Sequence, residues 1–251
     1  MKTSCEQKHK PIKGNENANA YAFVEYLECL AGYSKPSGKS DGLSQEPDEK
    51  PDRAALAKLR RTLGKKPDQA MNAFPYIVRW TEDLRPWHEQ SYYLVAALFG
   101  MYPSRSLHHQ RKLKNKKDSD DQEANDDQKG LGEYRCNLGA SFLKLDLARR
   151  DESKPEERSK SLERRFTALL MSRKEDLPER LRHAIKLLQS EKIPIDWVQL
   201  LLDLCRWDQS QRAVSARRPM ISSQRSWAKA FWRVDDNVLS ADATDGAEQD
   251  N

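Results

Sequence analysis

Apolar residues recur every three or four positions from Ser161 to Trp207, and this spacing predicts three consecutive amphipathic helices. The first apolar stripe consists of Leu162, Phe166, Leu169 and Leu170. The second consists of Leu177, Leu181, Ala184, Ile185 and Leu188, and the third of Trp197, Leu200, Leu201 and Leu204. Because only short turns join the three stretches, we expect them to pack as a compact bundle.

The second and third of these helices begin with capping signals. Asp176 precedes Glu179 by three positions, so its carboxylate is expected to accept the Glu179 backbone N–H. Pro178 lies in the first turn, where its missing N–H costs nothing. After the interruption at Pro194, Asp196 is the expected N-cap of the third helix.

The rest of the chain predicts further helices over residues 18–32, 53–63, 68–80, 87–102 and 136–147, with a last short helix containing Trp227 and Phe231. Gly32 and Gly64 are expected to end the first two, and Pro75 to kink or break the third. The stretch 87–102 is apolar on all sides, so we expect it at the centre of an N-terminal bundle.

Other stretches lack this periodicity. Residues 104–134 contain a basic block followed by the acidic DSDDQEANDD, and we expect them to form a disordered insertion. The basic half could contact nucleic acid, although the neighbouring acids would compete for it. Residues 1–17 and 236–251 are also expected to be disordered.

The predicted fold class is all-α, because no run of β-branched residues alternates with period two. We expect two small helical bundles joined by a charged linker, with a disordered insertion and disordered termini. The N-terminal bundle is placed at 18–150, with the insertion at about 104–134, and the basic C-terminal bundle at 151–235.

Charge is distributed unevenly along the 251 residues, whose formal net charge is +5. Residues 235–251 contain six acids and no base, which leaves about +11 on residues 1–234. Between Ser159 and Arg233, sixteen Lys or Arg outnumber eight Asp or Glu. Any single arginine can be a solvated surface residue, but the surplus predicts a polyanionic partner.

The cysteines and the apolar runs bear on the redox state and the location of the protein. The four cysteines show no C-x-x-C pair and no regular spacing, so we expect them to be reduced and structural. The longest apolar run, LVAALF at 94–99, is far shorter than the ~20 residues that span a bilayer. We therefore expect a soluble, cytoplasmic protein without a membrane partner.

Signatures of catalysis are absent from the sequence. Neither G-x-x-x-x-G-K-[ST] nor G-x-G-x-x-G occurs. His88-Glu89 begins like a zincin motif, but Tyr92 occupies the position of the second histidine. His183 lies in a basic helix, where exposure or a phosphate contact is favoured over catalysis. A cysteine nucleophile stays open, yet Cys205 lies on an apolar stripe. We expect no enzymatic activity, no catalytic residue, no metal and no cofactor.

Several motifs together resemble the CasB family, the small subunit of the type I-E CRISPR surveillance complex Cascade. They are, in order, YLVAALFGMYP, NLGASF, SLERRFTALL, DLPERLRHAIKLL, IPIDWVQLLLDLCRW and SWAKAFWR. The match covers roughly residues 18–234, and LRRTLG at 59–64 is similar to the family's arginine-bearing N-terminal helix. The chain departs from the family in a longer, more charged insertion between Tyr102 and Asn137, and in SARRPMISSQ after Val214.

The resemblance implies a non-catalytic subunit that is present as a pair beside the crRNA-bound backbone and the large subunit. Its basic residues would hold the backbones of crRNA and target DNA and stabilise the displaced strand of the R-loop. The matching motifs assign this nucleic-acid-binding role to Arg60, Arg61, Arg164, Arg165, Arg180 and Arg182. They also assign it to Arg225 and Lys229, whose geometry the insertion SARRPMISSQ puts in doubt.

Two other classes of protein remain open. A helical protein–protein adaptor could present the same basic surface to an acidic protein. A DNA-binding regulator is a third possibility, although the RHAIK helix lacks a helix-turn-helix partner with the usual tight turn. A steep dependence of affinity on salt would separate nucleic-acid binding from the adaptor, and sequence selectivity would identify the regulator.

Overall fold

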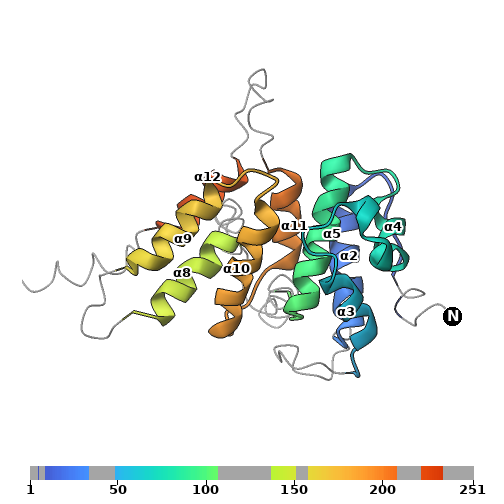
Figure 1. Cartoon of the computed structure of the whole chain (residues 1–251), viewed down its shortest axis with the longest axis horizontal. Helices are drawn as coiled ribbons and strands as arrows, with labels where there is room; N and C mark the ends of the chain where they lie inside the picture. The colour runs from blue at the N-terminus through green and yellow to red at the C-terminus, as the bar shows by residue number, and fades with distance from the viewer. Residues whose placement is uncertain are drawn as a thin grey trace, which may run out of the picture.

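The computed structural model describes Cys5 and residues 9–33, 49–106, 137–150, 158–207 and 222–233. Within these ranges every regular element is a helix, which confirms the predicted all-α fold (Figure 1). None of the described helices is long and apolar enough to cross a bilayer.

The N-terminal half contains α2 (Glu16–Leu30), α3 (Arg53–Arg60), the 3₁₀ turns η1 (Pro67–Gln69) and η2 (Met71–Ala73), α4 (Phe74–Thr81) and α5 (Pro86–Met101). The C-terminal half contains α8 (Leu138–Ala148), α9 (Lys160–Leu170), α10 (Leu177–Ser190), α11 (Trp197–Cys205) and α12 (Ser223–Phe231). The predicted break at Pro75 is confirmed: the proline lies in the first turn of α4, and two 3₁₀ turns replace the expected helix before it.

Most helix boundaries follow the signals in the sequence. The Asp52 and Asp196 side chains accept the backbone N–H groups of Ala55 and Gln199 at 2.9 and 3.0 Å. Gly32 and Gly64 adopt positive φ of 86° and 78° after α2 and α3.

The predicted cap at Asp176 is wrong. Its backbone is already helical, with φ −88° and ψ −15°, and its side chain makes no capping hydrogen bond. The N–H groups of Asp176 and Leu177 both donate to the Arg173 carbonyl, so a turn precedes α10. A residue held in that turn lacks the extended backbone that directs a side chain over the helix end.

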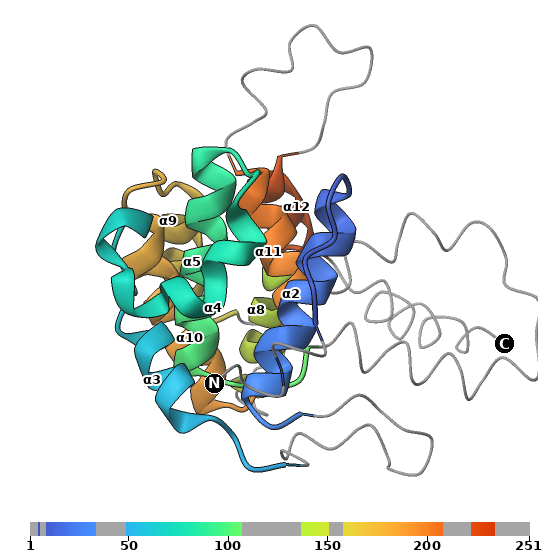
Figure 2. The ribbon, with the colours of Figure 1, turned by 90° about the vertical axis from the view of Figure 1, so that its right-hand side faces the viewer.

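α5 lies at the centre of the fold, as its sequence predicted. All its residues from Tyr92 to Phe99 are at most 5% exposed. The helix contacts α3 and α4 on one side and α10 and α11 on the other (Figures 1 and 2). Gly100 permits the crossing with α3, because a Cβ atom there would lie 2.8 Å from the Leu56 carbonyl oxygen.

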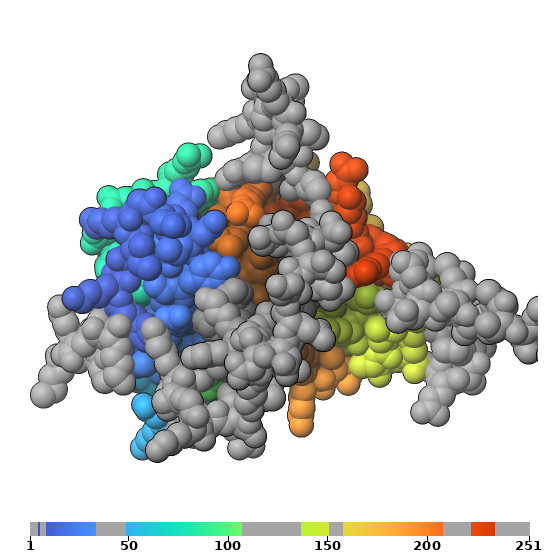
Figure 3. Space-filling view, turned by 180° about the vertical axis from the view of Figure 1, so that it is seen from behind, coloured from blue at the N-terminus to red at the C-terminus, as the bar shows by residue number. Residues whose placement is uncertain are grey.

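The C-terminal helices pack around aromatic side chains. The Phe166 ring lies between Phe142 and Phe231, with centroid separations of 4.9 and 4.4 Å. α8 and α12 approach closely at Gly139, where a Cβ atom would overlap the Trp227 backbone. Figure 3 shows α12 beside α8, and α2 beside α11, on the rear face.

The two halves share an extensive contact. α11 packs against α2 and α5, the Trp87 Nε1 donates to the Leu204 carbonyl at 2.7 Å, and the Phe99 and Trp197 rings lie 5.4 Å apart. The described buried apolar residues of both halves form one continuous cluster. The division into bundles at 18–150 and 151–235 stays a prediction.

Two stretches that the sequence assigned to disorder are in part packed. Ser104, Arg105 and Ser106 are at most 3% exposed, and Ser106 bonds to both Glu28 and Asp196. Residues 9–17 run into α2, with the Ile12 N–H donating to the Asn19 side chain at 3.1 Å. Residues 104–106 are held by partners distant in the sequence and residues 9–17 by the nearby α2, and composition alone predicts neither contact. The remainder of the insertion, 107–136, and residues 236–251 lie outside the described residues.

The expectation of reduced cysteines is wrong for one pair. Cys5 and Cys29 form a disulfide that ties the start of the chain to α2. Cys205 is not in a disulfide, and Cys136 lies outside the described residues. The spacing of the cysteines could not reveal this pair, because it depends on how the N-terminal segment packs on α2.

Candidate nucleic-acid interface

α10 combines a buried apolar stripe with a cationic outer surface. Leu177, Leu181, Ala184, Ile185 and Leu188 are buried and pack toward α5, α8 and α9. The 3.6-residue period therefore places the helix's cationic side chains on its solvent side, where Arg180, Arg182 and Lys186 are exposed together with His183. Two grooves flank this helix.

The first groove, which we call the α3–α10 groove, has a volume of about 630 Å³. Arg60 and Arg61, at the end of α3, line it together with Arg182 and Lys186 of α10. These four cations come from segments about 120 positions apart in the sequence. Their convergence creates a positive concavity suited to a polyanion.

Acidic side chains offset part of this charge. Glu175 and Glu179 also line the α3–α10 groove. A Glu179 carboxylate oxygen lies 3.6 Å from the Arg182 Nη1, and the other lies 3.6 Å from the His183 Nε2. Exposed pairs of this kind contribute little to stability, so Arg182 can exchange its partner for a phosphate at small cost.

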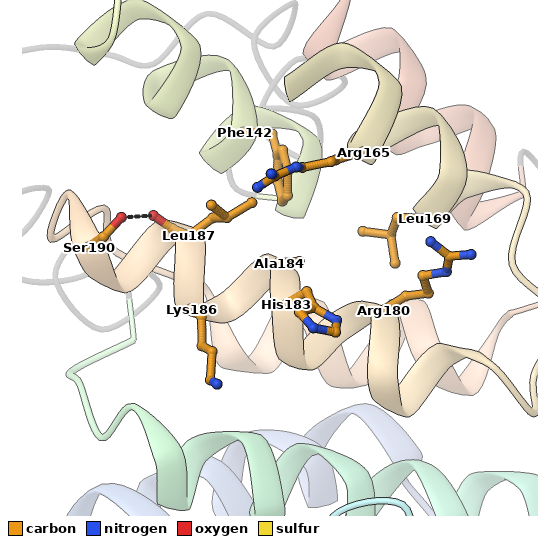
Figure 4. A pocket seen from close by; sticks show the side chains of 9 residues that line it. All are labelled: Phe142, Arg165, Leu169, Arg180, His183, Ala184, Lys186, Leu187 and Ser190. Carbon is orange, nitrogen blue, oxygen red and sulfur yellow. Dashed lines mark hydrogen bonds between the residues drawn. The ribbon is translucent and has the colours of Figure 1, made fainter. Parts of the chain in front are cut away.

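The second groove, which we call the α8–α10 groove, has a volume of about 410 Å³ and lies between α10, α8 and α9 (Figure 4). Its apolar lining consists of Phe142, Leu169, Ala184 and Leu187. Arg165, Arg180 and Lys186 provide its cations, the His183 imidazole lies among them, and none of its lining residues is acidic.

Figure 4 shows how the cations are arranged around the second groove. Arg165 extends from α9 toward Phe142, and Arg180 lies beside Leu169. Lys186 points toward the α5 side of α10, which explains why it lines both grooves. α10 thus lines both grooves, and together they form one broad basic surface.

All eight basic residues singled out from the sequence are exposed. The α3–α10 groove brings together Arg60, Arg61 and Arg182, and the α8–α10 groove brings together Arg165 and Arg180. Arg164, Arg225 and Lys229 line neither groove. Sequence reasoning missed Lys186, although its position four residues after Arg182 places it on the same side of α10.

Arg225 and Lys229 belong to α12, which is fixed by its buried neighbours. Trp227 Nε1 donates to the Asp203 carboxylate, and Ser223 Oγ donates to the Asp203 carbonyl at 2.8 Å. The two cations face solvent on this helix. They extend the positive charge beyond the grooves without contributing to either one.

His88 and Cys205, unlike the exposed His183, have buried surroundings. His88 is 6% exposed, and burial lowers its pKa from 6.5, although its Nδ1 lies 3.6 Å from a Glu16 carboxylate oxygen. Burial raises the pKa of Cys205 to about 12, which makes a thiolate rare at neutral pH. Among the described residues, no three His, Cys, Asp or Glu side chains gather as a metal site.

The family model described as CRISPR-associated protein Cse2 matches residues 55–232. The CRISPR-associated protein Cse2 of Thermus thermophilus is 30% identical over 181 residues, covering 71% of this chain and 79% of that protein.

Two solved structures are also similar. CasB from M. ruber is 28% identical, with a TM-score of 0.55 over 90% of this chain and 97% of that chain. A chain of a CRISPR RNA-guided surveillance complex is 19% identical, with a TM-score of 0.56 over 91% of this chain and 99% of that one. The latter likeness concerns the fold alone.

Proposed function

The chain belongs to the CRISPR-associated Cse2 family, and from this membership we propose that it is the non-catalytic small subunit of a type I-E Cascade surveillance complex. In this role it binds nucleic-acid backbone with basic helix faces. It thereby stabilises the R-loop between guide RNA and target DNA, together with the displaced strand, in antiviral defence.

The observation that carries the proposal is the convergence of cations on both sides of α10. Arg60, Arg61 and Arg182 meet in one groove, Arg165 and Arg180 in the other, and Lys186 lines both. Exposed guanidinium groups are suited to phosphates because they donate several hydrogen bonds in a fixed plane. A surface of this kind tracks a backbone without reading bases.

The energetics of an R-loop make such contacts sufficient. Replacing a DNA duplex by an RNA–DNA duplex and a displaced strand is a nearly balanced exchange. Each phosphate that a Lys or Arg neutralises releases a counterion and adds a favourable, salt-dependent contribution to binding. A few cations on a non-catalytic subunit can therefore shift the equilibrium toward the open state.

The partners that follow from this role are crRNA and target DNA, the backbone and large subunits of the complex, and a second copy of the same chain. The similarity to CasB of M. ruber and to a chain of an RNA-guided surveillance complex supports this setting. A membrane partner is not part of the proposal.

A second candidate function is that of a helical protein–protein adaptor. The apolar lining of the α8–α10 groove favours it, because Phe142, Leu169 and Leu187 offer a surface that phosphates alone do not use. An adaptor would use the basic residues to assemble with an acidic protein, so their loss would prevent assembly.

The experiment that tests the proposal uses the complex assembled with its partner subunits. The groove variant carries Arg165→Ala, Arg180→Ala, Arg182→Ala and Lys186→Ala. The control variant loses the same charge at exposed positions outside both grooves, through Lys10→Ala, Lys13→Ala, Arg53→Ala and Arg85→Ala. The displaced strand is detected by permanganate reactivity on a supercoiled target.

We expect the groove variant to assemble normally but to form fewer R-loops than the wild type, whereas the control variant forms as many. Equal R-loop formation by an assembled groove variant would contradict the proposed role. Failure of the groove variant alone to assemble would favour the adaptor.

A further inference from the structure

The α8–α10 groove differs from the α3–α10 groove in a way that bears on its ligand. Its lining holds four apolar side chains, three cationic ones and His183 without an acid, whereas Glu175 and Glu179 line the other groove. Phe142, Leu169 and Ala184 are at most 4% exposed and form its base. A complementary ligand presents apolar groups flanked by negative charge.

Residues 234–251 of the same chain have this composition. The segment VDDNVLSADATDGAEQDN contains six acids and no base, with Val238 and Leu239 between Asp236 and Asp242. In the acidic block at 118–127, by contrast, only one alanine accompanies the acids and polar residues. Residues 234–251 therefore match the groove in both charge and apolar content.

The point at which this segment begins is also fixed. Arg158, just before α9, donates to the Phe231 carbonyl at 2.6 Å and to the Arg233 carbonyl at 3.3 Å. Trp232 Nε1 donates to a Glu163 carboxylate oxygen at 3.0 Å. The segment thus begins beside the first turn of α9, whose later residues Arg165 and Leu169 line the groove.

The length of the segment is sufficient to reach the groove. From Lys160 to Leu169 the helix rises roughly 14 Å at 1.5 Å per residue. An extended chain covers about 3.3 Å per residue, so the residues from Val234 to Leu239 span roughly 17 Å. Counted from Arg233, whose carbonyl Arg158 holds, six extended steps place Leu239 up to roughly 20 Å away, which exceeds this rise.

We propose that residues 234–251 dock in the α8–α10 groove and compete there with nucleic acid. Val238 and Leu239 cover the apolar base, while the flanking aspartates lie near Arg165 and Arg180. The competition, but not the docking, rests on the proposed function. A tethered segment acts at millimolar effective concentration, so even a weak contact suppresses non-specific binding until a stronger polyanion displaces it.

Docking is tested in the full chain, without nucleic acid, by a photo-crosslinking amino acid in place of Leu239. We expect intramolecular crosslinks to peptides that contain Phe142, Leu169 or Leu187, and we expect Arg165→Ala with Arg180→Ala to reduce them. As a matched control, the crosslinker at the position of Asp250 should give fewer crosslinks to those peptides. No crosslinks to the groove, or crosslinks only between two copies of the chain, would overturn the docking.

Competition is tested by the affinity of the full chain for a non-specific single strand. Val238→Ser with Leu239→Ser should tighten binding by roughly two- to tenfold, as expected when a segment at millimolar effective concentration binds in the range of about 0.1–1 mM. The control pair Ala241→Ser with Ala243→Ser should leave the affinity unchanged. In the Arg165→Ala, Arg180→Ala background, the gain should disappear.

The two measurements separate the two claims. Crosslinks in the groove with no change in affinity would support the docking but overturn the competition, and with it the assignment of this groove to nucleic acid. Absence of groove crosslinks would overturn the docking. If Arg165→Ala with Arg180→Ala still weakened nucleic-acid binding, the proposed function would remain intact.

Discussion

Asp203 joins α11 to α12 through a set of buried hydrogen bonds. It is 4% exposed, and its carboxylate accepts the Trp227 Nε1 at 2.5 Å and the Gln199 Nε2 at 2.9 Å. Its backbone carbonyl accepts the Ser223 hydroxyl. One residue of α11 thus sets the position of the helix that carries Arg225 and Lys229.

Replacing Asp203 by Ala is expected to lower the free energy of unfolding by about 1–3 kcal/mol, because the buried Trp227 N–H loses its acceptor. Urea denaturation followed by circular dichroism measures this loss. Asp203→Asn, which keeps one carbonyl oxygen, should lose less. Equal stability of the Ala variant and the wild type would show that the bond does not hold α12.

His88 should make stability depend on pH. Burial lowers its pKa in the folded state, with smaller contributions in the same direction from Arg85 and Lys174, whereas Glu16 and a hydrogen bond to the Cys205 backbone oppose the shift. The unfolded chain keeps the ordinary pKa of 6.5. The stability that comes from keeping His88 neutral is therefore complete above pH 6.5. It is lost as the pH falls through the lowered pKa of the folded state.

The prediction is that the free energy of unfolding falls as the pH is lowered below 6.5, and that His88→Gln reduces this fall. Chemical denaturation at several pH values provides the measurement. A decrease of the same size in both proteins would assign the pH dependence to other groups.

Single residues also mark the limits of the sequence prediction. The exposure of Arg164, Arg165, Arg180 and Arg182 followed from the apolar stripes, because a helix has a known period. The cap at Asp176 failed, because a local turn at Arg173 had already fixed its backbone. Helix periodicity and capping signals therefore predict the structure where no neighbouring turn fixes the backbone differently.

Among the elements, α8 and α12 depend on a glycine for their close approach. A Cβ atom at Gly139 would overlap backbone atoms of Trp227, so α12 could not stay in place. Alanine is otherwise about 1 kcal/mol more favourable than glycine inside a helix. The steric overlap would destabilise an alanine variant and the helix propensity would stabilise it, so the sign of the measured change shows whether the helices approach this closely.

Gly139→Ala is expected to destabilise the protein by about 1–3 kcal/mol despite the gain in helix propensity, because the core cannot absorb the added methyl group without a backbone shift. Thermal unfolding of the variant checks this. Lys144→Ala, at an exposed position of the same helix, should stay within about 0.5 kcal/mol of the wild type. A stabilised Gly139→Ala variant would contradict the close approach.

Element prediction succeeded where the apolar period was long and failed where contacts were distant. α9, α10 and α11 follow their stripes, α5 is buried all round as its apolar sequence predicted, and Asp52 and Asp196 cap as expected. Residues 104–106 resemble the charged insertion in composition, yet bonds to Glu28 and Asp196 bury Ser106. No local pattern encodes partners 78 and 90 positions away.

For the molecule as a whole, the disulfide between Cys5 and Cys29 ties the first residues of the chain to α2. The two cysteines are 24 positions apart. Closing a loop of this length is worth about 3 kcal/mol in the chain-entropy account. Composition and spacing could not predict the bond, since both are also compatible with reduced thiols.

Cys5→Ser should therefore lower the free energy of unfolding by up to about 3 kcal/mol under oxidising conditions. A reductant should lower the melting temperature of the wild type and leave that of the variant unchanged. Thermal unfolding of the wild type and the variant, with and without reductant, measures the loss of stability and the effect of the reductant. A wild type indifferent to the reductant would contradict the bond.

The basic surface, too, is a property of the whole molecule. The sequence predicted charged faces on α3, α9 and α10, since each helix carries arginines opposite its apolar stripe. It could not predict that Arg60 and Arg61 meet Arg182 and Lys186, because that contact depends on how α3 and α10 are placed around α5. The two grooves are thus a consequence of tertiary packing.

The most direct test of the central claim is a salt titration of nucleic-acid binding by the assembled complex. For a single strand, each phosphate contact contributes about 0.7 to the slope of log K against log salt. The groove variant, shown to be folded by circular dichroism, should lose up to roughly 3 units of slope and bind all sequences more weakly. The control variant should keep the wild-type slope. A folded groove variant with the affinity and slope of the wild type would contradict the account.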